Sequence, residues 1–132
     1  MSNRKTGNAF ENEFCEMLFN EGYWVHNLTQ NNAGQPADVI AVKNGKAFLI
    51  DCKVCEGNSF PLSRIEPNQH SAMSLWKQSG NGNGWFALRL NDGSVYMLDH
   101  DLMKAFGVGS SIINEDSIRH YGQDFERWVK RW

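Results

Sequence analysis

The sequence predicts an α/β fold with a mixed central β-sheet and helices on both faces of it. Two apolar runs, Asp38 to Lys43 and Lys46 to Lys53, flank an Asn44-Gly45 pair, which is the strongest short-range signal for a two-residue β-hairpin turn. Nearly every position of both runs is apolar, as expected for strands at the centre of a sheet covered on both sides. Helical patterns occur before and after this hairpin, and we expect residues 1–132 to form a single domain.

The segment before the hairpin is expected to contain one helix and one strand. A helical pattern begins near Thr6 and ends at Gly22, with apolar residues at the spacing i, i+4, i+7 and i+8; these are Phe10, Phe14, Met17 and Leu18. The next segment, Tyr23 to Leu28, has the composition of a strand. A polar loop from Thr29 to Pro36 then leads to Asp38.

A second helix is expected after the hairpin, opened by Pro67 near its first position. Its sheet-facing stripe contains one polar and three apolar residues, namely Gln69, Ala72, Met73 and Trp76. Two further strands, Trp85 to Leu90 and Val95 to Leu98, flank a turn. The sequence therefore predicts a return to the sheet after the second helix.

The last third of the chain is expected to be mainly helical. Asp99 or Asp101 can cap a short helix that runs through Ala105, and residues 107–111 are expected to form a loop. The tail from Asp116 to Trp132 is expected to be one helix, interrupted or begun again at Gly122. Whether the end of this tail packs on the core or contacts DNA or a second subunit is left open by the sequence.

Composition places the chain among globular proteins and restricts its partners. Hydrophobic residues make up 41% and charged residues 21% of the chain. The net charge is −2, so there is no overall basic field, and any DNA-binding surface has to be local. No apolar run approaches the ~20 residues that span a bilayer, and the start of the chain is polar, so we expect a cytoplasmic location and no membrane partner.

The three cysteines do not suggest a disulfide framework. Cys52 and Cys55 have the CxxC spacing of many zinc sites, but on a strand they point to opposite faces of the sheet. We therefore do not expect structural zinc, nor any small-molecule cofactor.

The hairpin carries a cluster of charges at one end. A two-residue turn fixes the register, which pairs Lys43 with Lys46 at the turn and Asp38 with Asp51 at the far end. Like charges that lie directly opposite destabilise a sheet unless something neutralises them, and a divalent cation is the usual solution. Side chains alternate along a strand, so Lys53 shares a face with Asp51.

Two helices can extend this cluster. Glu11 and Glu13 lie on opposite borders of the apolar stripe of the first helix, and either can lean over the edge of the sheet. Gln69 is a polar residue on the otherwise apolar face of the second helix. The cluster therefore combines acids, an amine and an amide.

This arrangement resembles the PD-(D/E)xK nuclease superfamily from roughly Gly7 to Leu98. The segment Gly7-Asn-Ala-Phe-Glu11 is similar to the G-x-x-x-E motif of its first helix, and Asp38 with Asp51-Cys-Lys53 is similar to its two-strand metal motif. The segment from Ser59 to Met73 resembles the one that follows the lysine in RecU-type Holliday-junction resolvases, including phage and prophage versions. In two departures from the pattern, Ala37 separates Pro36 from Asp38, and Asp replaces the commoner Glu at position 51.

The resemblance implies a restriction-endonuclease-like fold and a metal-dependent DNA endonuclease that resolves Holliday junctions in recombination and repair. Asp38 and Asp51 would hold Mg²⁺ or Mn²⁺, hard ions that prefer oxygen ligands, with the Cys52 carbonyl as a further ligand. Glu11 would bind the metal directly or through water. Lys53 would orient or deprotonate the attacking water, and Gln69 would position Lys53, the water or a phosphate.

The resemblance also implies partners. Symmetric cleavage of a four-way junction requires two active sites, and therefore a homodimer. Contacts to DNA phosphates are expected from Arg4, Lys5 and Arg64, although single basic residues are usually ordinary surface residues.

Other interpretations remain open for the same residues. Asp38 and Asp51 can be strand-end caps, Lys53 a structural ion-pair partner, Glu11 a solvated helix charge, and Gln69 a core-edge amide bonded to backbone. Two other functions are compatible with the pattern. One is a different nuclease of this superfamily, acting on duplex, flap or single-stranded DNA, and the other is a DNA-binding module of the same fold without catalysis.

Overall fold

The computed structural model describes residues 3–28 and 36–132, with side chains described from Asn8 onward. Most of the predicted loop from Thr29 to Pro36 lies outside the described residues. The elements, in chain order, are α1 (Asn3–Asn20), β1 (Trp24–Asn27), β2 (Val39–Lys43), β3 (Lys46–Val54), β4 (Phe60–Pro61), the 3₁₀ turn η1 (Leu62–Arg64), α2 (Pro67–Gln78), β5 (Trp85–Arg89), β6 (Val95–Asp99), α3 (His100–Gly109), β7 (Ile112–Ile113), α4 (Glu115–Tyr121), β8 (Gln123–Asp124) and α5 (Phe125–Lys130).

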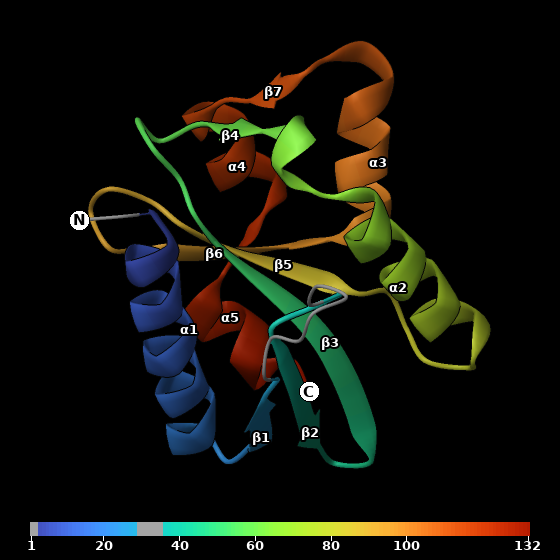
Figure 1. Cartoon of the computed structure of the whole chain (residues 1–132). Helices are drawn as coiled ribbons and strands as arrows, with labels where there is room; N and C mark the ends of the chain where they lie inside the picture. Colours follow the sequence, from blue (N-terminus) through green and yellow to red (C-terminus); the bar gives the residue numbers. More distant parts are fainter. Residues whose placement is uncertain (1–2, 29–35) are drawn as a thin grey trace.

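A six-stranded sheet forms the centre of the molecule (Figure 1). Its strand order is β1-β2-β3-β5-β6-β8. Strands β3 and β5 run parallel, and the other neighbouring pairs are antiparallel. Strands β4 and β7 pair separately as a second, two-stranded sheet. The predicted mixed sheet with flanking helices is confirmed.

The β2–β3 hairpin has the register that the sequence predicts. Lys43 lies opposite Lys46, and the pairing continues to Val39 opposite Ile50. The turn residues Asn44 and Gly45 both have positive φ angles, 52° and 76°, as a type I′ turn requires. This turn matches the right-handed twist of the strands, so it fixes which residues face each other along the whole hairpin.

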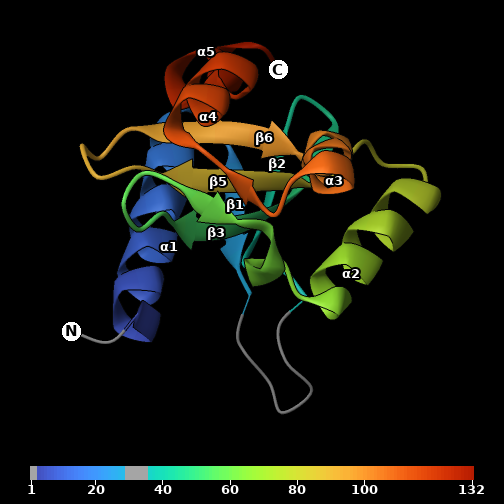
Figure 2. The ribbon, with the colours of Figure 1, turned by 90° about the horizontal axis from the view of Figure 1, so that it is seen from above.

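The sheet separates two apolar clusters. One face is covered by α1 and α5, whose buried residues pack on even-numbered residues of β3 such as Phe48 and Ile50. The other face is covered by α2, α3 and α4, which pack on Leu49, Phe86 and Leu88. Figure 2 shows α1 and α2 at opposite sides of the strands. Burial on both faces explains why the central strands are almost entirely apolar.

The C-terminal third differs from the predicted pattern in three places. Helix α3 continues to Gly109, where a loop was expected. Residues 112–113 form β7, which pairs with β4. The expected tail helix is divided into α4 and α5 by β8, which adds an edge to the sheet beside β6. These strands are two residues long and pair with distant parts of the chain, so local periodicity could not reveal them.

The end of the chain packs on the core. Trp128 is fully buried, and its ring contacts Tyr23, Phe48 and Trp85. Trp132 packs against the same cluster. Of the alternatives left open by the sequence, packing on the core is therefore the one that applies to Trp128 and Trp132. In the described part of the chain, no helix has the length and apolar character needed to cross a membrane.

Gly84 provides a test of the packing between α2 and the sheet. A Cβ atom at this position would lie 2.5 Å from Met73 Sδ and 2.7 Å from Met73 Cγ. Met73 is fully buried, so its side chain has little room to move aside. We expect Gly84→Ala to lower the free energy of unfolding by about 1–3 kcal/mol, as overpacking usually does. Urea denaturation measures this change.

Gly82→Ala is the matched control, because a Cβ there meets nothing within 4 Å. Equal stability of the two variants would show that Met73 can move aside without cost.

Candidate active site

Asp38 and Asp51 lie side by side at the end of the hairpin, and both are buried, with 9% and 1% of their surface exposed. The ladder between β2 and β3 ends at Val39, whereas β3 continues to Val54. The backbone N–H of Cys52 therefore lies beyond the last β2 residue, and it donates a hydrogen bond to Asp38 Oδ2 at 2.7 Å. The carboxylate of Asp38 thus takes the place of the backbone carbonyl that a neighbouring strand would offer to this N–H.

Lys53 and Gln69 complete a compact set of contacts around Asp51. Lys53 Nζ lies 3.2 Å from Asp51 Oδ2. Gln69 Nε2 donates to Asp51 Oδ1 at 3.3 Å, and Gln69 Oε1 accepts from Lys53 Nζ at 3.4 Å. Gln69 Oε1 also accepts from the backbone N–H of Glu66 at 3.0 Å. These contacts fix the orientation of the amide, with its oxygen toward Lys53 and its nitrogen toward Asp51.

The bond from Glu66 to Gln69 was not anticipated from the sequence. Glu66 is the N-cap of α2, and Gln69 is the third residue of the helix. A residue that can cap a helix, followed three positions later by Glu or Gln, is the pattern of a capping box. The spacing Glu66-Pro-Asn-Gln69 could have indicated that this amide has a structural partner as well as a place in the site.

The two candidate acids of α1 have different surroundings. Glu11 is half-buried and is hydrogen-bonded to Asp38. Glu13 is exposed, and its Oε1 accepts from Arg89 Nη2 at 3.0 Å. This hydrogen bond lowers the pKa of Glu13. The structure therefore brings Glu11 to the acid cluster and places Glu13 in a surface ion pair.

Burial and mutual repulsion hold protons in the cluster. Burial, followed by the charge of Asp38, raises the pKa of Glu11 to about 7. Burial and then Asp38 also raise the pKa of Asp51 well above its usual range, and the nearby Lys53 only partly offsets this effect. A cation among these oxygens would reverse both shifts, because it favours the charged form of each acid.

The donor set fits a magnesium-type ion. Asp51 Oδ2 is buried and accepts no hydrogen bond of regular geometry from the described residues. Within the described part of the chain, no three His, Cys, Asp or Glu side chains form a closed metal site. Mg²⁺ is usually bound by one or two carboxylates and completes its coordination with water and substrate phosphate oxygens. An open site built on Asp38 and Asp51 has this character.

Other predicted residues lie away from the cluster or outside the described side chains. Arg64 Nη1 donates to the Val54 carbonyl at 2.7 Å, and its guanidinium lies over the Phe60 ring. Contact of Arg64 with DNA stays a prediction. The side chains of Arg4 and Lys5 are not among those described.

The two cysteines with CxxC spacing lie in different apolar clusters. Cys52 packs with α1 and α5, and Cys55 packs with the elements on the other face of the sheet. This is the arrangement expected for alternating side chains of an extended segment. All three cysteines of the chain are free thiols.

Comparison with known proteins identifies the family. The model of the archaeal Holliday junction resolvase family, Hjc, matches residues 1–131. A solved structure of Hjc from Archaeoglobus fulgidus, described as a Holliday junction resolvase from an archaeal hyperthermophile, has a TM-score of 0.72 and 16% identity, with 96% of this chain and 98% of that chain covered. No curated protein matches the chain in sequence. These matches support the expected junction resolvase of the PD-(D/E)xK type. The family that matches is the archaeal one, and the matches do not support the RecU-type or phage assignment.

The raised pKa of Glu11 predicts how the stability of the metal-free protein depends on pH. The unfolded chain loses this proton near its ordinary pKa of 4.5, whereas the folded chain keeps it up to about 7. Stability contributed by the group therefore falls as pH rises through this window. We expect the Tm in EDTA to fall from pH 5 to pH 8, and Glu11→Gln to reduce the fall.

Glu13→Gln is the control, because Glu13 is exposed and paired with Arg89. A Tm profile of Glu11→Gln that superimposes on the wild-type profile would contradict the assigned surroundings of Glu11.

Proposed function

The chain belongs to the archaeal Holliday junction resolvase (Hjc) family and is a junction-resolving endonuclease. We propose that Asp38 and Asp51 hold the divalent ion used in cleavage. The observation that carries the proposal is the buried Asp51 carboxylate, which lies within reach of Lys53 and Gln69 while its Oδ2 accepts no regular hydrogen bond from the described residues. Mg²⁺ or Mn²⁺ suits these oxygen donors.

A bound Mg²⁺ or Mn²⁺ would neutralise the two acids and polarise the phosphate. The Cys52 carbonyl is a further ligand in this proposal. A residue in a strand presents its N–H and its C=O to the same side, and the Cys52 N–H points to Asp38. Glu11 is hydrogen-bonded to Asp38, so it is suited to bind a metal-bound water or the metal itself.

Lys53 is the residue that we propose acts on the attacking water. Its ammonium group is mostly buried, with 15% of the side chain exposed, and it lies between Asp51 and Gln69. A positive charge at this place orients water and offsets the negative charge that develops on the phosphate during hydrolysis. Gln69 is a positioning residue, because it contacts Lys53 and Asp51 at once and is fixed by the Glu66 backbone.

The homodimer, the cytoplasmic location and a role for Arg4, Lys5 and Arg64 in DNA binding are also part of this proposal. Two active sites are needed to cut the two strands of a junction symmetrically, and a pair of identical subunits supplies them. The narrower RecU-type and phage assignment rests on the resemblance of residues 59–73 alone, and the family match gives it no support.

Cleavage assays separate the proposed function from its alternatives. A labelled four-way junction and a matching linear duplex are incubated with the protein and Mg²⁺, Mn²⁺ or EDTA. Paired, metal-dependent nicks in the junction alone support the proposal. Cleavage of both DNAs would favour a general nuclease, and tight junction binding without cleavage would favour a non-catalytic module.

Asp51→Asn is expected to abolish cleavage and to retain or improve junction binding, because it removes a carboxylate that repels phosphate but keeps the shape of the side chain. Cleavage and electrophoretic mobility shift measure the two effects separately. Full activity of this variant would refute the assignment of Asp51 to the metal site.

Lys53→Ala is expected to lower the cleavage rate by at least ~10²-fold without loss of folding. Lys77→Ala is the matched control, because Lys77 is an exposed lysine paired with Asp101 on α3. Single-turnover kinetics with junction DNA measure both rates. If the two variants cleave equally fast, Lys53 has only the structural role of pairing with Asp51.

A further inference from the structure

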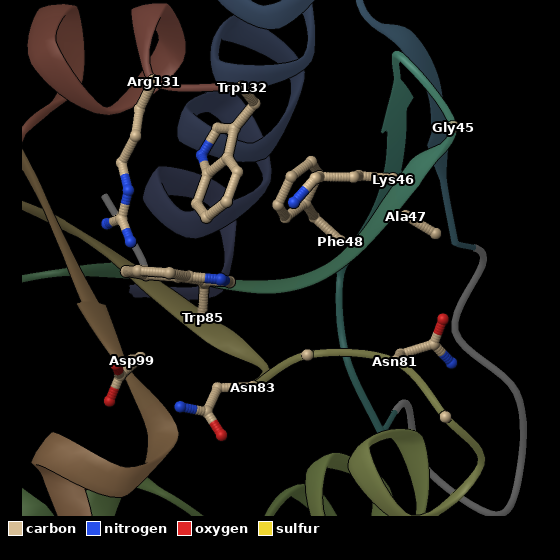
Figure 3. Close-up of a pocket in the computed structure, with 12 residues that line it drawn as sticks. Gly45, Lys46, Ala47, Phe48, Asn81, Asn83, Trp85, Asp99, Arg131 and Trp132 are labelled. Atoms are coloured by element: carbon tan, nitrogen blue, oxygen red, sulfur yellow. The ribbon is translucent and has the colours of Figure 1, made fainter.

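A pocket of about 400 Å³ lies where the central sheet is incomplete. Strand β5 begins at Trp85, opposite Ile50, whereas β3 begins at Lys46. In the described chain, residues 46–49 of β3 therefore have no neighbouring strand on the β5 side. The space is bounded by this part of β3, the 80–83 loop and the end of the chain, as Figure 3 shows.

Two cations border the pocket, Lys46 and Arg131. Both are exposed, and neither belongs to an ion pair among the described residues, whereas Lys77, Arg89, Lys104 and Arg119 all do. Lys46 also lies directly opposite Lys43 in the hairpin, an arrangement of like charges that costs stability. An anion at this border would offset that cost.

The acid among the lining residues is Asp99, and its carboxylate already has a partner. Asp99 Oδ1 accepts from the backbone N–H of Leu102 at 2.8 Å and caps α3. The positive end of a helix favours a carboxylate at this position. The positive charge of Lys46 and Arg131 is therefore not consumed by Asp99.

Aromatic rings form one side of the pocket. Trp132 lies beneath both cations, with Lys46 Nζ 5.2 Å and Arg131 Cζ 4.4 Å from its ring. Phe48 and Trp85 lie beside Trp132 (Figure 3) but are buried, with 5% and 6% of their surface exposed, so Trp132 supplies the accessible aromatic surface. Aromatic rings with nearby cations are the combination that holds unpaired nucleotides, because bases stack on the rings and phosphates meet the charges.

The opposite side is a loop of small and amide residues, Gly80, Asn81, Gly82 and Asn83. A Cβ at Gly82 would meet nothing within 4 Å, so this side is open. Amide side chains offer donors and acceptors together, which suits the edge of a base.

We propose that this pocket binds one unpaired nucleotide of the DNA substrate, with its phosphate at Lys46 and Arg131 and its base beside the aromatic side. The inference rests on the proposed action on branched DNA, because base pairs that open at a branch point leave nucleotides unpaired. It concerns a place apart from the metal site, since Lys46 and Phe48 point to the face of β3 opposite Asp51. The volume lies within the usual range of ligand pockets, roughly 300–1,000 Å³.

Fluorescence anisotropy with a labelled oligo(dT) of about eight nucleotides tests this inference. The measurement is made in EDTA, so that cleavage does not occur. We expect Lys46→Gln and Gly82→Leu each to weaken binding at least about tenfold, because one removes the charge and the other adds a bulky side chain to the loop that lines the pocket. Lys46→Gln should also reduce the salt dependence by about 0.7 in log–log slope.

Lys130→Gln and Gly109→Leu are the matched controls. Lys130 is an exposed lysine beside Arg131 but not in the pocket, and Gly109 is another glycine with open space. Both are expected to bind as the wild type does. Equal losses in the control and test variants, or no loss in any, would overturn the proposal.

Competition separates a nucleotide from a simple anion. Thymidine monophosphate is expected to displace the oligonucleotide at lower concentration than inorganic phosphate. Equal potency would mean an anion site without base recognition, which overturns the nucleotide assignment. Because Lys46 and Gly82 lie outside the metal site, junction cleavage by the wild type with Mg²⁺ reports on the proposed function independently of this result.

Discussion

The buried carboxylate of Asp51 is the constraint on which the rest of the structure depends. A charge with 1% exposure is costly unless its surroundings compensate for it. The compensation comes from Lys53 on the same strand and from Gln69 on α2, whereas Asp38, next to the start of β2, adds repulsion. The Asn44-Gly45 turn brings Asp38 and Asp51 together, because it sets the register of β2 against β3. A slip by one residue would move the set to opposite faces.

The acid cluster, which we propose to be the active site, has a cost in stability. Glu11 and Asp51 keep raised pKa values because burial and Asp38 both oppose their charged forms. Replacing such acids by neutral residues would relieve repulsion, as is common where a sequence keeps groups that weaken the fold for the sake of chemistry. The surrounding interactions remain well satisfied. The Cys52 N–H is bonded to Asp38, and the Gln69 amide has partners on both of its polar atoms. These hydrogen bonds fix the orientation of the Asp38 carboxylate and of the Gln69 amide beside Asp51.

The sequence predicted the hairpin, its register and the acid cluster because these follow from local rules. A two-residue turn and the alternation of side chains fix Val39 opposite Ile50 without knowledge of the rest of the chain. The choice between Glu11 and Glu13 depends on Arg89, which comes from β5 and pairs with Glu13, so helix phase alone could not decide it. Strand β8 was missed for the same reason, since its pairing with Met97 involves a distant strand. The hydrogen bond from the Glu66 N–H to Gln69 could be predicted only if the start of α2 was known to within one residue, because it requires Glu66 to be the N-cap.

The distribution of positive charge explains how a chain with a net charge of −2 can act on DNA. Carboxylates hold Lys77, Arg89, Lys104 and Arg119 in surface ion pairs, which leaves their charges largely neutralised. Lys46 and Arg131 form no such pair among the described residues and lie near the turn of the hairpin and the end of α5. Affinity for phosphates depends on the number of cations that can meet them, and not on the net charge of the chain. Cations without an ion-pair partner, such as the two at the proposed nucleotide pocket, can therefore attract phosphates locally on a mildly acidic molecule.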